Sequence, residues 1–247
     1  MENLSPEEAT RYERQLIMPE IGPEGQRRLK AACVLVSGLG GLGSISASYL
    51  VAAGIGRVRL VDLDSVQRSN LNRQLLHWSD DIGKTKVDSA LHKLHRLNPG
   101  CRLDGRHEEI NRRNAGDLMV DCTVVVDGTD NLKTRKVLNK ASIEKGIPFV
   151  FGGVEGFNGM VTTFVPGQTP CLDCLFPQQG FQKKRPGIIG PLPGLVASIQ
   201  AAETIKLVLG MKGLLKGRLL HIRGGDMTFK EINIDKNPDC PTCKKKP

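Results

Sequence analysis

Short apolar segments alternate with longer amphipathic ones along the first part of the chain. Four short segments are rich in branched apolar residues and are typical of buried parallel strands: residues 33–37, 57–62, 122–127 and 148–151. Helical patterns follow the first three, up to residue 53, at residues 84–97 and at residues 131–145. This alternation predicts a doubly wound parallel sheet with helices on both faces.

The pattern changes after Gly152. Residues 159–165, 218–222 and 227–234 alternate between apolar and polar positions, as antiparallel strands do when one face meets solvent. We therefore expect an α/β fold with a Rossmann-like, mixed, mainly parallel sheet. Its antiparallel C-terminal extension would cap one edge of the sheet.

Three further segments lie outside this alternation. Ser5-Pro6-Glu7-Glu8 has an N-cap serine and a glutamate three residues later, so it predicts a helix with Arg11 and Arg14 on one face. Residues 176–193 are rich in Gly, Pro, Lys and Gln without periodicity, and we expect a long mobile loop over the functional site. Residues 195–209 are apolar but interrupted by polar residues, which favours a buried core helix.

The composition adds a basic net charge to this picture. The chain has 35 Lys and Arg against 26 Asp and Glu, a net charge of +9. Such an excess attracts nucleic acid, phosphates or an acidic protein, and a solvated basic surface explains it equally well. Aromatic residues do not interleave with the basic ones, so we expect no specific nucleic-acid partner. No apolar run reaches the roughly 18 residues of a membrane span, and we expect a cytoplasmic protein without a membrane partner.

A glycine-rich turn follows the first predicted strand and opens a helix. The turn contains Gly38, Gly40, Gly41 and Gly43. Without side chains in the way, its backbone N–H groups and the helix dipole can hold a phosphate. The turn therefore predicts a nucleotide site.

Two acids support this interpretation. Asp62 and Asp64 end the next strand, close to the roughly 20-residue offset of an acid that binds ribose hydroxyls. Taken alone, the turn and the acids favour an NAD(P)-dependent oxidoreductase. That alternative gives no reason for the basic and acidic residues that follow.

The segment from Asp62 to Gln74, Asp-Leu-Asp-Ser-Val-Gln-Arg-Ser-Asn-Leu-Asn-Arg-Gln, precedes Gly83-Lys84-Thr85-Lys86. These motifs resemble the MoeB, ThiF and HesA adenylyltransferases, relatives of ubiquitin-activating enzymes. The resemblance also includes residues 11–15, 127–131, 171–174 and 198–201, and it covers essentially the whole chain. It implies ATP-dependent adenylation of the C-terminal carboxylate of a small ubiquitin-like sulfur carrier that ends in Gly-Gly. Molybdopterin, thiamine or a related biosynthesis would use the product.

The residues fit that chemistry. A carboxylate that attacks the α-phosphate of ATP needs positive charge on the phosphates and a metal for the leaving pyrophosphate. We expect Arg73 and Lys86 to neutralise the triphosphate and Asp130 to bind Mg²⁺. Each residue alone is more simply a surface charge or a loop cap, but their joint spacing favours a site. The remaining expected nucleotide contacts are Asn70, Gln74 and Asn131.

Arg14 lies outside the predicted nucleotide core. In the resembling family the matching arginine reaches the ATP of the neighbouring subunit, so the resemblance implies a homodimer in which Arg14 is catalytic in trans. A solvated helix face is the alternative.

Two Cys-x-x-Cys pairs stand far apart, at Cys171 and Cys174 and at Cys240 and Cys243. Four thiolates at this spacing suit a tetrahedral Zn²⁺ that ties the C-terminal segment to the domain. Because all four ligands come from the protein, such a metal would be structural. Disulfides are disfavoured without a secretion signal, and neither pair sits on a first strand-to-helix turn as a redox pair would.

The other cysteines and the histidines receive no chemical role. Cys33, Cys101 and Cys122 are expected to be small buried residues. The five histidines show no ligand-like pairing apart from His92 and His95, which we expect on a helix surface.

The chain departs from several relatives at the crossover loop, where they have a cysteine. The matching position is Lys183, and no cysteine occurs between Cys174 and Cys240. We expect the acyl-adenylate to be the end product, with a separate sulfurtransferase supplying sulfur. Residues 183–185 are basic and are expected either to dock an acidic carrier or to be solvated.

These expectations describe one adenylyltransferase domain over residues 1–247. It divides into an N-terminal helical segment at residues 1–30, a nucleotide-binding core at residues 31–152, and a zinc-stapled, carrier-binding half at residues 153–247. A zinc-ribbon nucleic-acid-binding protein is a third hypothesis, supported only by the basic charge.

Overall fold

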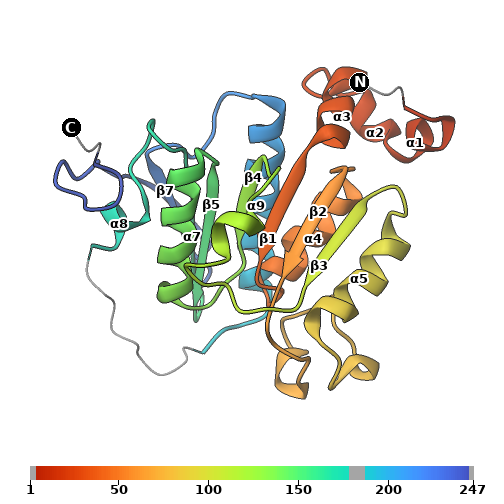
Figure 1. The fold of residues 1–247 in the computed structure, drawn as a ribbon, viewed down its shortest axis with the longest axis horizontal. Coiled ribbons are helices and arrows are strands. Elements are labelled where there is room, and N and C mark those ends of the chain that lie inside the picture. The colour runs from red at the N-terminus through yellow and green to blue at the C-terminus, as the bar shows by residue number, and fades with distance from the viewer. Residues whose placement is uncertain (1–3, 178–186, 245–247) are drawn as a thin grey trace.

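The structure is a computed structural model that describes residues 4–177 and 187–244. Within these residues the chain forms one sheet of eight strands in the order β3-β2-β1-β4-β5-β6-β7-β8 (Figure 1). The parallel strands are β1 (Cys33–Ser37), β2 (Arg57–Val61), β3 (Arg102–Arg106), β4 (Val124–Asp127) and β5 (Phe149–Glu155). The antiparallel strands are β6 (Asn158–Phe164), β7 (Arg218–Arg223) and β8 (Thr228–Asn233).

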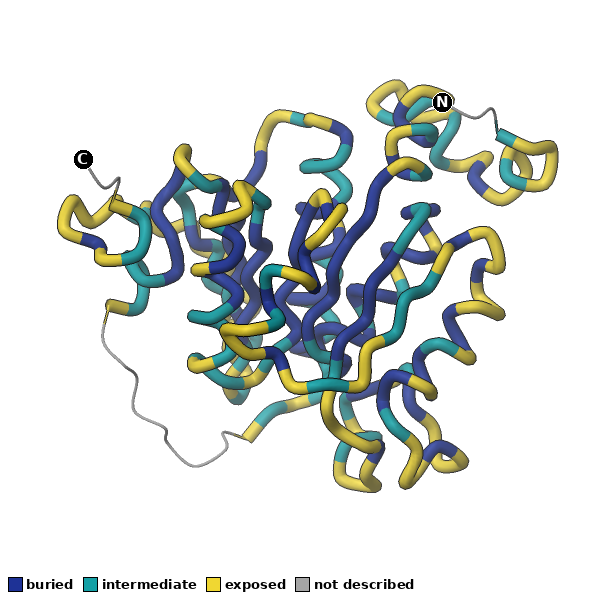
Figure 2. Tube along the Cα trace, viewed as in Figure 1, coloured by how far each residue is buried: buried dark blue, intermediate teal, exposed yellow. Residues whose placement is uncertain are grey.

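Helices cover both faces of the sheet (Figure 1). One face is covered by α3 (Gly22–Ala31), α4 (Gly43–Ala52), α5 (Lys86–Leu97) and α9 (Pro191–Leu209). The other is covered by α6 (Ala115–Leu118), α7 (Leu132–Lys145) and α8 (Leu172–Leu175). The central strands are buried along their length (Figure 2), so the core lies on both sides of them. The predicted mixed, mainly parallel sheet is confirmed.

The helix α9 is long and apolar enough to cross a membrane, yet it packs as a core helix. Half of its most apolar window is buried inside the protein. Gln200 in α9 donates hydrogen bonds to the carbonyls of Asp127 and Val150, at 2.8 and 3.1 Å. These bonds tie the helix to β4 and β5, as the sequence analysis expected of a buried helix.

The N-terminal helix differs from its prediction. The capping box at Ser5 is present, but α1 (Pro6–Arg11) ends before Tyr12, and a second short helix, α2 (Glu13–Leu16), follows it. Tyr12 is buried, and its hydroxyl accepts a hydrogen bond from Asn98 at 2.8 Å. This tertiary contact accompanies the break in the helix, so Arg11 and Arg14 lie in two consecutive short helices and not in one.

Two other expectations need correction. β3 was not predicted, because Arg-Leu-Asp-Gly-Arg has one large apolar residue and forms the partly exposed sheet edge. α9 begins at Pro191, so the predicted loop of residues 176–193 is shorter at its C-terminal end. Residues 178–186 of that loop, with Lys183 and its two basic neighbours, lie outside the described residues.

Candidate functional site

The loops after β1 and β4 are packed backbone against backbone. Gly38 has φ +86°, and a Cβ there would lie 2.7 Å from the carbonyl oxygen of Gly128. A Cβ at Gly128 or Gly43 would come within 2.5 or 1.7 Å of the carbonyl oxygen of Gly38. Only glycine fits these positions, because a side chain on either loop would push the loops apart. With the adjacent loop after β2, these loops form what we call the glycine edge.

The predicted turn leaves backbone donors available at this edge. Within the described residues, the N–H groups of Gly40 and Gly41 donate no hydrogen bond. They precede α4, whose N-terminal turn adds a favourable dipole for an anion. The side-chain amide of Gln74 lies close by, since a Cβ at Gly40 would be 3.6 Å from its Nε2.

Gln74 itself points to a missing polar partner. The residue is 4% exposed, and its Oε1 has no hydrogen-bond partner among the described residues. A buried amide oxygen without a partner is costly for folding alone. Its position beside the glycine turn therefore fits a polar ligand.

The predicted acids and lysine meet at the end of β2. The buried Lys86 ammonium lies 2.7 Å from Asp64 Oδ2 and 3.9 Å from Asp62 Oδ2. Asp62 Oδ2 also accepts a hydrogen bond from the Leu39 N–H at 2.6 Å, so this acid is joined to the glycine turn. Asp64 is largely exposed, which leaves its second oxygen free to meet a ligand.

The end of β4 contains an ion pair that sequence reasoning missed. Asp127 is fully buried and pairs with Arg135 Nε at 2.8 Å. Burial raises the pKa of Asp127, and the Arg135 charge opposes that rise. Arg135 also donates to the carbonyls of Thr129 and Gly152, which holds the loop that presents Asp130. In the sequence, the spacing between Asp127 and Arg135 was the only signal for this ion pair.

Asp130 follows at the surface. Its carboxylate is exposed and forms no hydrogen bond or ion pair within the described part of the chain. Because β2, β1 and β4 are neighbours, it lies at the same edge as Lys86 and the glycine turn. An exposed carboxylate at this edge is suited to a divalent cation.

The other predicted contacts have local roles in this structure. The guanidinium of Arg73 donates to the Ser69 carbonyl and to Asn72 Oδ1, both at 2.9 Å. Asn70 Oδ1 accepts from the Gln67 N–H, and Asn131 Oδ1 accepts from the Thr134 N–H as the N-cap of α7. Their nucleotide contacts stay predictions.

Arg14 is exposed on α2, away from these loops. Figure 1 shows α1 to α3 at the end of the sheet where β1 begins, whereas the glycine turn follows the other end of β1. The structure thus does not bring Arg14 together with the other predicted catalytic residues of its own chain.

The four paired cysteines do come together, in what we call the cysteine corner. Their Sγ atoms all lie within 4.8 Å of one another, with contacts of 3.6 Å from Cys171 to Cys240 and 3.5 Å from Cys174 to Cys243. Four sulfurs at the usual Zn–S bond length would stand about 3.8 Å apart in a tetrahedron. The corner can therefore hold a tetrahedral metal ion.

Hydrogen bonds add to the cysteine corner. Asp173 Oδ2 accepts from Thr242 Oγ1 at 2.7 Å and from Asn139 Nδ2 at 3.1 Å. The C-terminal segment, α8 and α7 are thereby linked through one carboxylate.

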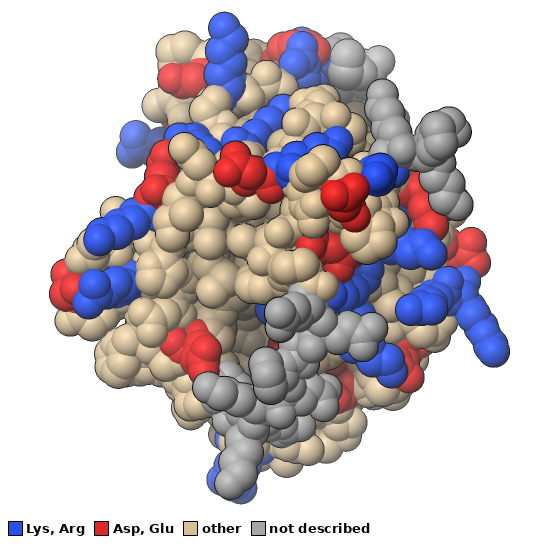
Figure 3. All heavy atoms as spheres, turned by 90° about the vertical axis from the view of Figure 1, so that its left-hand side faces the viewer, with Lys and Arg blue, Asp and Glu red and all other residues tan. Residues whose placement is uncertain are grey.

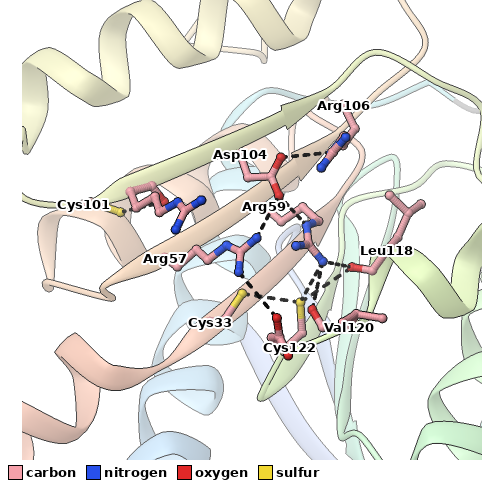
Figure 4. A network of polar contacts seen from close by, with 11 residues as sticks. Cys33, Arg57, Arg59, Cys101, Asp104, Arg106, Leu118, Val120 and Cys122 are labelled. Carbon is pink, nitrogen blue, oxygen red and sulfur yellow. Dashed lines mark hydrogen bonds and ion pairs between the residues drawn. The ribbon is translucent and has the colours of Figure 1, made fainter.

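Two of the remaining cysteines form an unexpected pair (Figure 4). Cys33 and Cys122 are buried as predicted, but their Sγ atoms are 3.5 Å apart. Arg59 lies beside them, held by Asp104 at 2.8 Å and by the Leu118 carbonyl at 2.7 Å. The hydrogen bond with Cys122 lowers the pKa of Cys33 to about 7. Burial instead raises the pKa of Cys101 to about 12.

The charge distribution gives little support to a nucleic-acid surface near the cysteine corner. Figure 3 shows Lys and Arg interspersed with Asp and Glu on this face, without a continuous basic stripe among the described residues. Mixed signs are typical of a solvated surface.

Comparison with known proteins decides the family. The ThiF family description matches residues 12–242, nearly the whole chain and all of the loops just described. The chain belongs to the ThiF family. This ThiF-family chain is 43% identical over 238 residues to the SAMP-activating enzyme E1 of Haloferax volcanii, covering 94% of this chain and 88% of that protein. It is 41% identical over 251 residues to the sulfur carrier protein adenylyltransferase of Thermus thermophilus, covering 98% and 93%.

A longer relative carries a second activity in its name. The adenylyltransferase and sulfurtransferase MOCS3 of Culex quinquefasciatus is 39% identical, and the match covers 99% of this chain but 57% of that protein. The family and these relatives place the ThiF-family chain among the adenylyltransferases.

Solved structures agree on the fold. Selenomethionine PaaA has a TM-score of 0.82 at 26% identity, covering 94% of this chain and 84% of that one. E. coli MccB with MccA-N7isoASN has a TM-score of 0.86 at 24% identity, covering 98% and 76%, which shows the fold alone.

Proposed function

We propose that this chain transfers AMP from ATP to the C-terminal glycine carboxylate of a small ubiquitin-like sulfur carrier. The carrier carboxylate oxygen attacks the α-phosphorus, forms the acyl-adenylate bond and breaks the bond to the leaving pyrophosphate. The observation that carries the proposal is the buried Gln74 side chain beside the free Gly40 and Gly41 amides: its Oε1 has no partner among the described residues, and its Nε2 would lie 3.6 Å from a Cβ at Gly40. The names of the Thermus and Haloferax relatives support the carrier as acceptor.

The residues of the glycine edge would have different roles in this reaction. The Gly40 and Gly41 amides and Lys86 would bind phosphate oxygens, and Arg73 would leave its local partners to join them. Asp62 or Asp64 would contact the ribose. Asp130 would hold Mg²⁺, which supplies charge neutralisation on the pyrophosphate when it is bound.

The second site of the proposal is the cysteine corner, which would hold one structural Zn²⁺. Three of the separations between its sulfurs, 3.5, 3.6 and 4.0 Å, are close to the tetrahedral value, and none of the four positions would be left open for a substrate.

The assembly that we propose is a homodimer with shared sites. A hollow of about 470 Å³ lies between α4 and α9 and is lined by apolar side chains, including Ile45, Leu75 and Leu97. Leu75 and Tyr49 are 67% and 54% exposed there, an apolar surface that a second copy can cover. In such a dimer Arg14 would complete the partner's glycine edge. The proposal also includes a cytoplasmic location and a separate protein that donates sulfur.

The test is carrier-stimulated exchange of labelled pyrophosphate into ATP. Candidate carriers that end in Gly-Gly are each compared with the same carrier lacking its last glycine. We expect exchange that needs Mg²⁺ and an intact carrier, and at least a tenfold loss with Asp130→Asn, since Asp130 would bind the metal. NADH binding without ATP binding would support an oxidoreductase instead.

A further inference from the structure

Leu39, inside the glycine turn, is held on both sides of its backbone by buried side chains. Its N–H donates to Asp62 Oδ2 at 2.6 Å. Its carbonyl oxygen lies 2.9 Å from Nε2 of His77, a residue that is 2% exposed. His77 thus contacts the turn that would bind phosphate, although its sequence context gave it no role.

The partners of His77 fix which ring nitrogen carries the proton. A carbonyl oxygen can only accept, so Nε2 must donate to Leu39. The Nδ1 atom must then accept, and the Ser89 hydroxyl at 2.8 Å is its donor. Ser89 Oγ in turn accepts from the Lys93 ammonium at 2.9 Å, and Lys93 pairs with the buried Asp81.

The surroundings also favour the uncharged ring. Burial lowers the pKa of His77, and the ammonium groups of Lys93 and Lys86 act in the same direction. The hydrogen bond to Leu39 and the charge of Asp62 oppose this shift without reversing it.

The orientation of one peptide depends on this ring. The Leu39–Gly40 peptide is trans, so its C=O and the N–H of Gly40 point in opposite directions. Gly40 has no Cβ to restrain the plane of that peptide. The hydrogen bond from His77 to the Leu39 carbonyl therefore turns the Gly40 N–H away from the protein interior. In that orientation the N–H donates to no described residue.

We propose that His77 is a positioning residue for ATP, which acts by holding the Leu39–Gly40 peptide so that the Gly40 N–H faces the phosphates. This requires the tautomer with its proton on Nε2. The series of polar contacts that runs from Asp81 through Lys93 and Ser89 to His77 sets that tautomer. The inference rests on the proposed function, because it needs ATP at the glycine edge. His77 itself touches no reacting atom.

Three variants separate positioning from simple support of the fold. His77→Leu removes the donor, whereas His77→Gln keeps an N–H at a similar distance from the backbone. Ser89→Ala leaves the ring and removes the donor to Nδ1. Each is measured for melting temperature, for ATP affinity by calorimetry with Mg²⁺, and for the KM of ATP and of carrier in pyrophosphate exchange.

We expect His77→Leu to raise the Kd and KM of ATP about tenfold, because a buried carbonyl loses its partner. His77→Gln should recover most of this loss, and Ser89→Ala should raise the KM of ATP about threefold. The KM of carrier should stay unchanged in all three. If folded His77→Leu and Ser89→Ala bind ATP as tightly as wild type and differ only in melting temperature, His77 is structural and the inference is wrong.

If His77→Leu does not fold, the ATP affinity and the KM of ATP of Ser89→Ala decide between positioning and a structural role. A readout on the wild-type chain is independent of activity: two-bond ¹H–¹⁵N spectra at about pH 6.5, where an ordinary imidazole is half protonated. We expect His77 to be neutral with its proton on Nε2, and a proton on Nδ1 or a charged ring would contradict the inference. If wild type neither binds ATP nor exchanges pyrophosphate, the proposed function fails instead.

Discussion

The glycine edge and the cysteine corner are held together in opposite ways. At the glycine edge, backbone packs on backbone through Gly38, Gly43 and Gly128, and the side chains with proposed chemistry, both buried and exposed, lie around these loops. At the cysteine corner, side chains from segments 69 residues apart meet, and a carboxylate on α8 joins them to α7. Side-chain changes should therefore alter chemistry at the glycine edge and stability at the cysteine corner.

The largest effect on activity is expected for the two cationic side chains that would contact the triphosphate. Lys86→Ala and Arg14→Ala should each lower pyrophosphate exchange by on the order of a thousandfold, since each removes a cation from the transition state. Arg14→Ala should keep a near-wild-type melting temperature, and Lys86→Ala should lose some stability because Asp62 and Asp64 lose their cation. A large loss of stability without loss of exchange would break the comparison.

Mixed dimers sharpen this prediction. If Arg14 acts across a twofold interface, co-expression of the two variants produces one intact site in each mixed dimer. Random pairing should then restore about a quarter of wild-type exchange. Isolated mixed dimers that are as inactive as their parents would show that Arg14 does not act in trans.

Cys174→Ser tests the opposite region. It should release the metal and lower the melting temperature by about 10 °C, the shift that about 3 kcal/mol produces in a chain of this size. Exchange per folded molecule should change little. Metal analysis should find one zinc per wild-type chain after dialysis, and disulfides in freshly purified protein would contradict the assignment.

Gln74→Met tests a single polar atom of the glycine edge. The side chain is similar in size but lacks the unpartnered oxygen, so the fold should be equally stable or more stable. The KM of ATP should rise about tenfold, because a hydrogen-bond donor of the bound nucleotide, a hydroxyl or amino group, loses that buried acceptor. A destabilised variant with unchanged KM would assign the oxygen to the fold instead.

The smallest effect is expected at Cys33, Cys101 and Cys122. Replacing all three with Ala should leave exchange per folded molecule unchanged, although Cys33 and Cys122 are closer to each other than the sequence suggested. A carrier thioester trapped on any of them would show that the reaction goes beyond the acyl-adenylate.

The parts that sequence predicted are those specified by local pattern. The residues of β1 form a continuous apolar run, and the Ser5 cap is a local signature, so both were found. β3 was missed because an edge strand keeps its charged residues, and the break at Tyr12 depends on a contact with Asn98 far along the chain.

The same limit applies to the site. The glycine turn and the cysteine pairs are motifs with fixed spacing, so the sequence indicates which residues the structure brings together in each. His77 has no such motif, because its partners are a backbone carbonyl and a hydroxyl on another element. The Cys33 and Cys122 pair likewise arises only when β1 and β4 become neighbours.

The contact between Gly38 and Gly128 also predicts the outcome of saturation mutagenesis. Alanine at either position places its methyl carbon within 2.7 Å of the opposite backbone, and no rotamer change can relieve a clash with a Cβ. A second substitution cannot rescue the first, since neither residue has a side chain left to shorten. In a complete library these two positions, with Gly43, should therefore accept no alternative residue and show no compensating pairs.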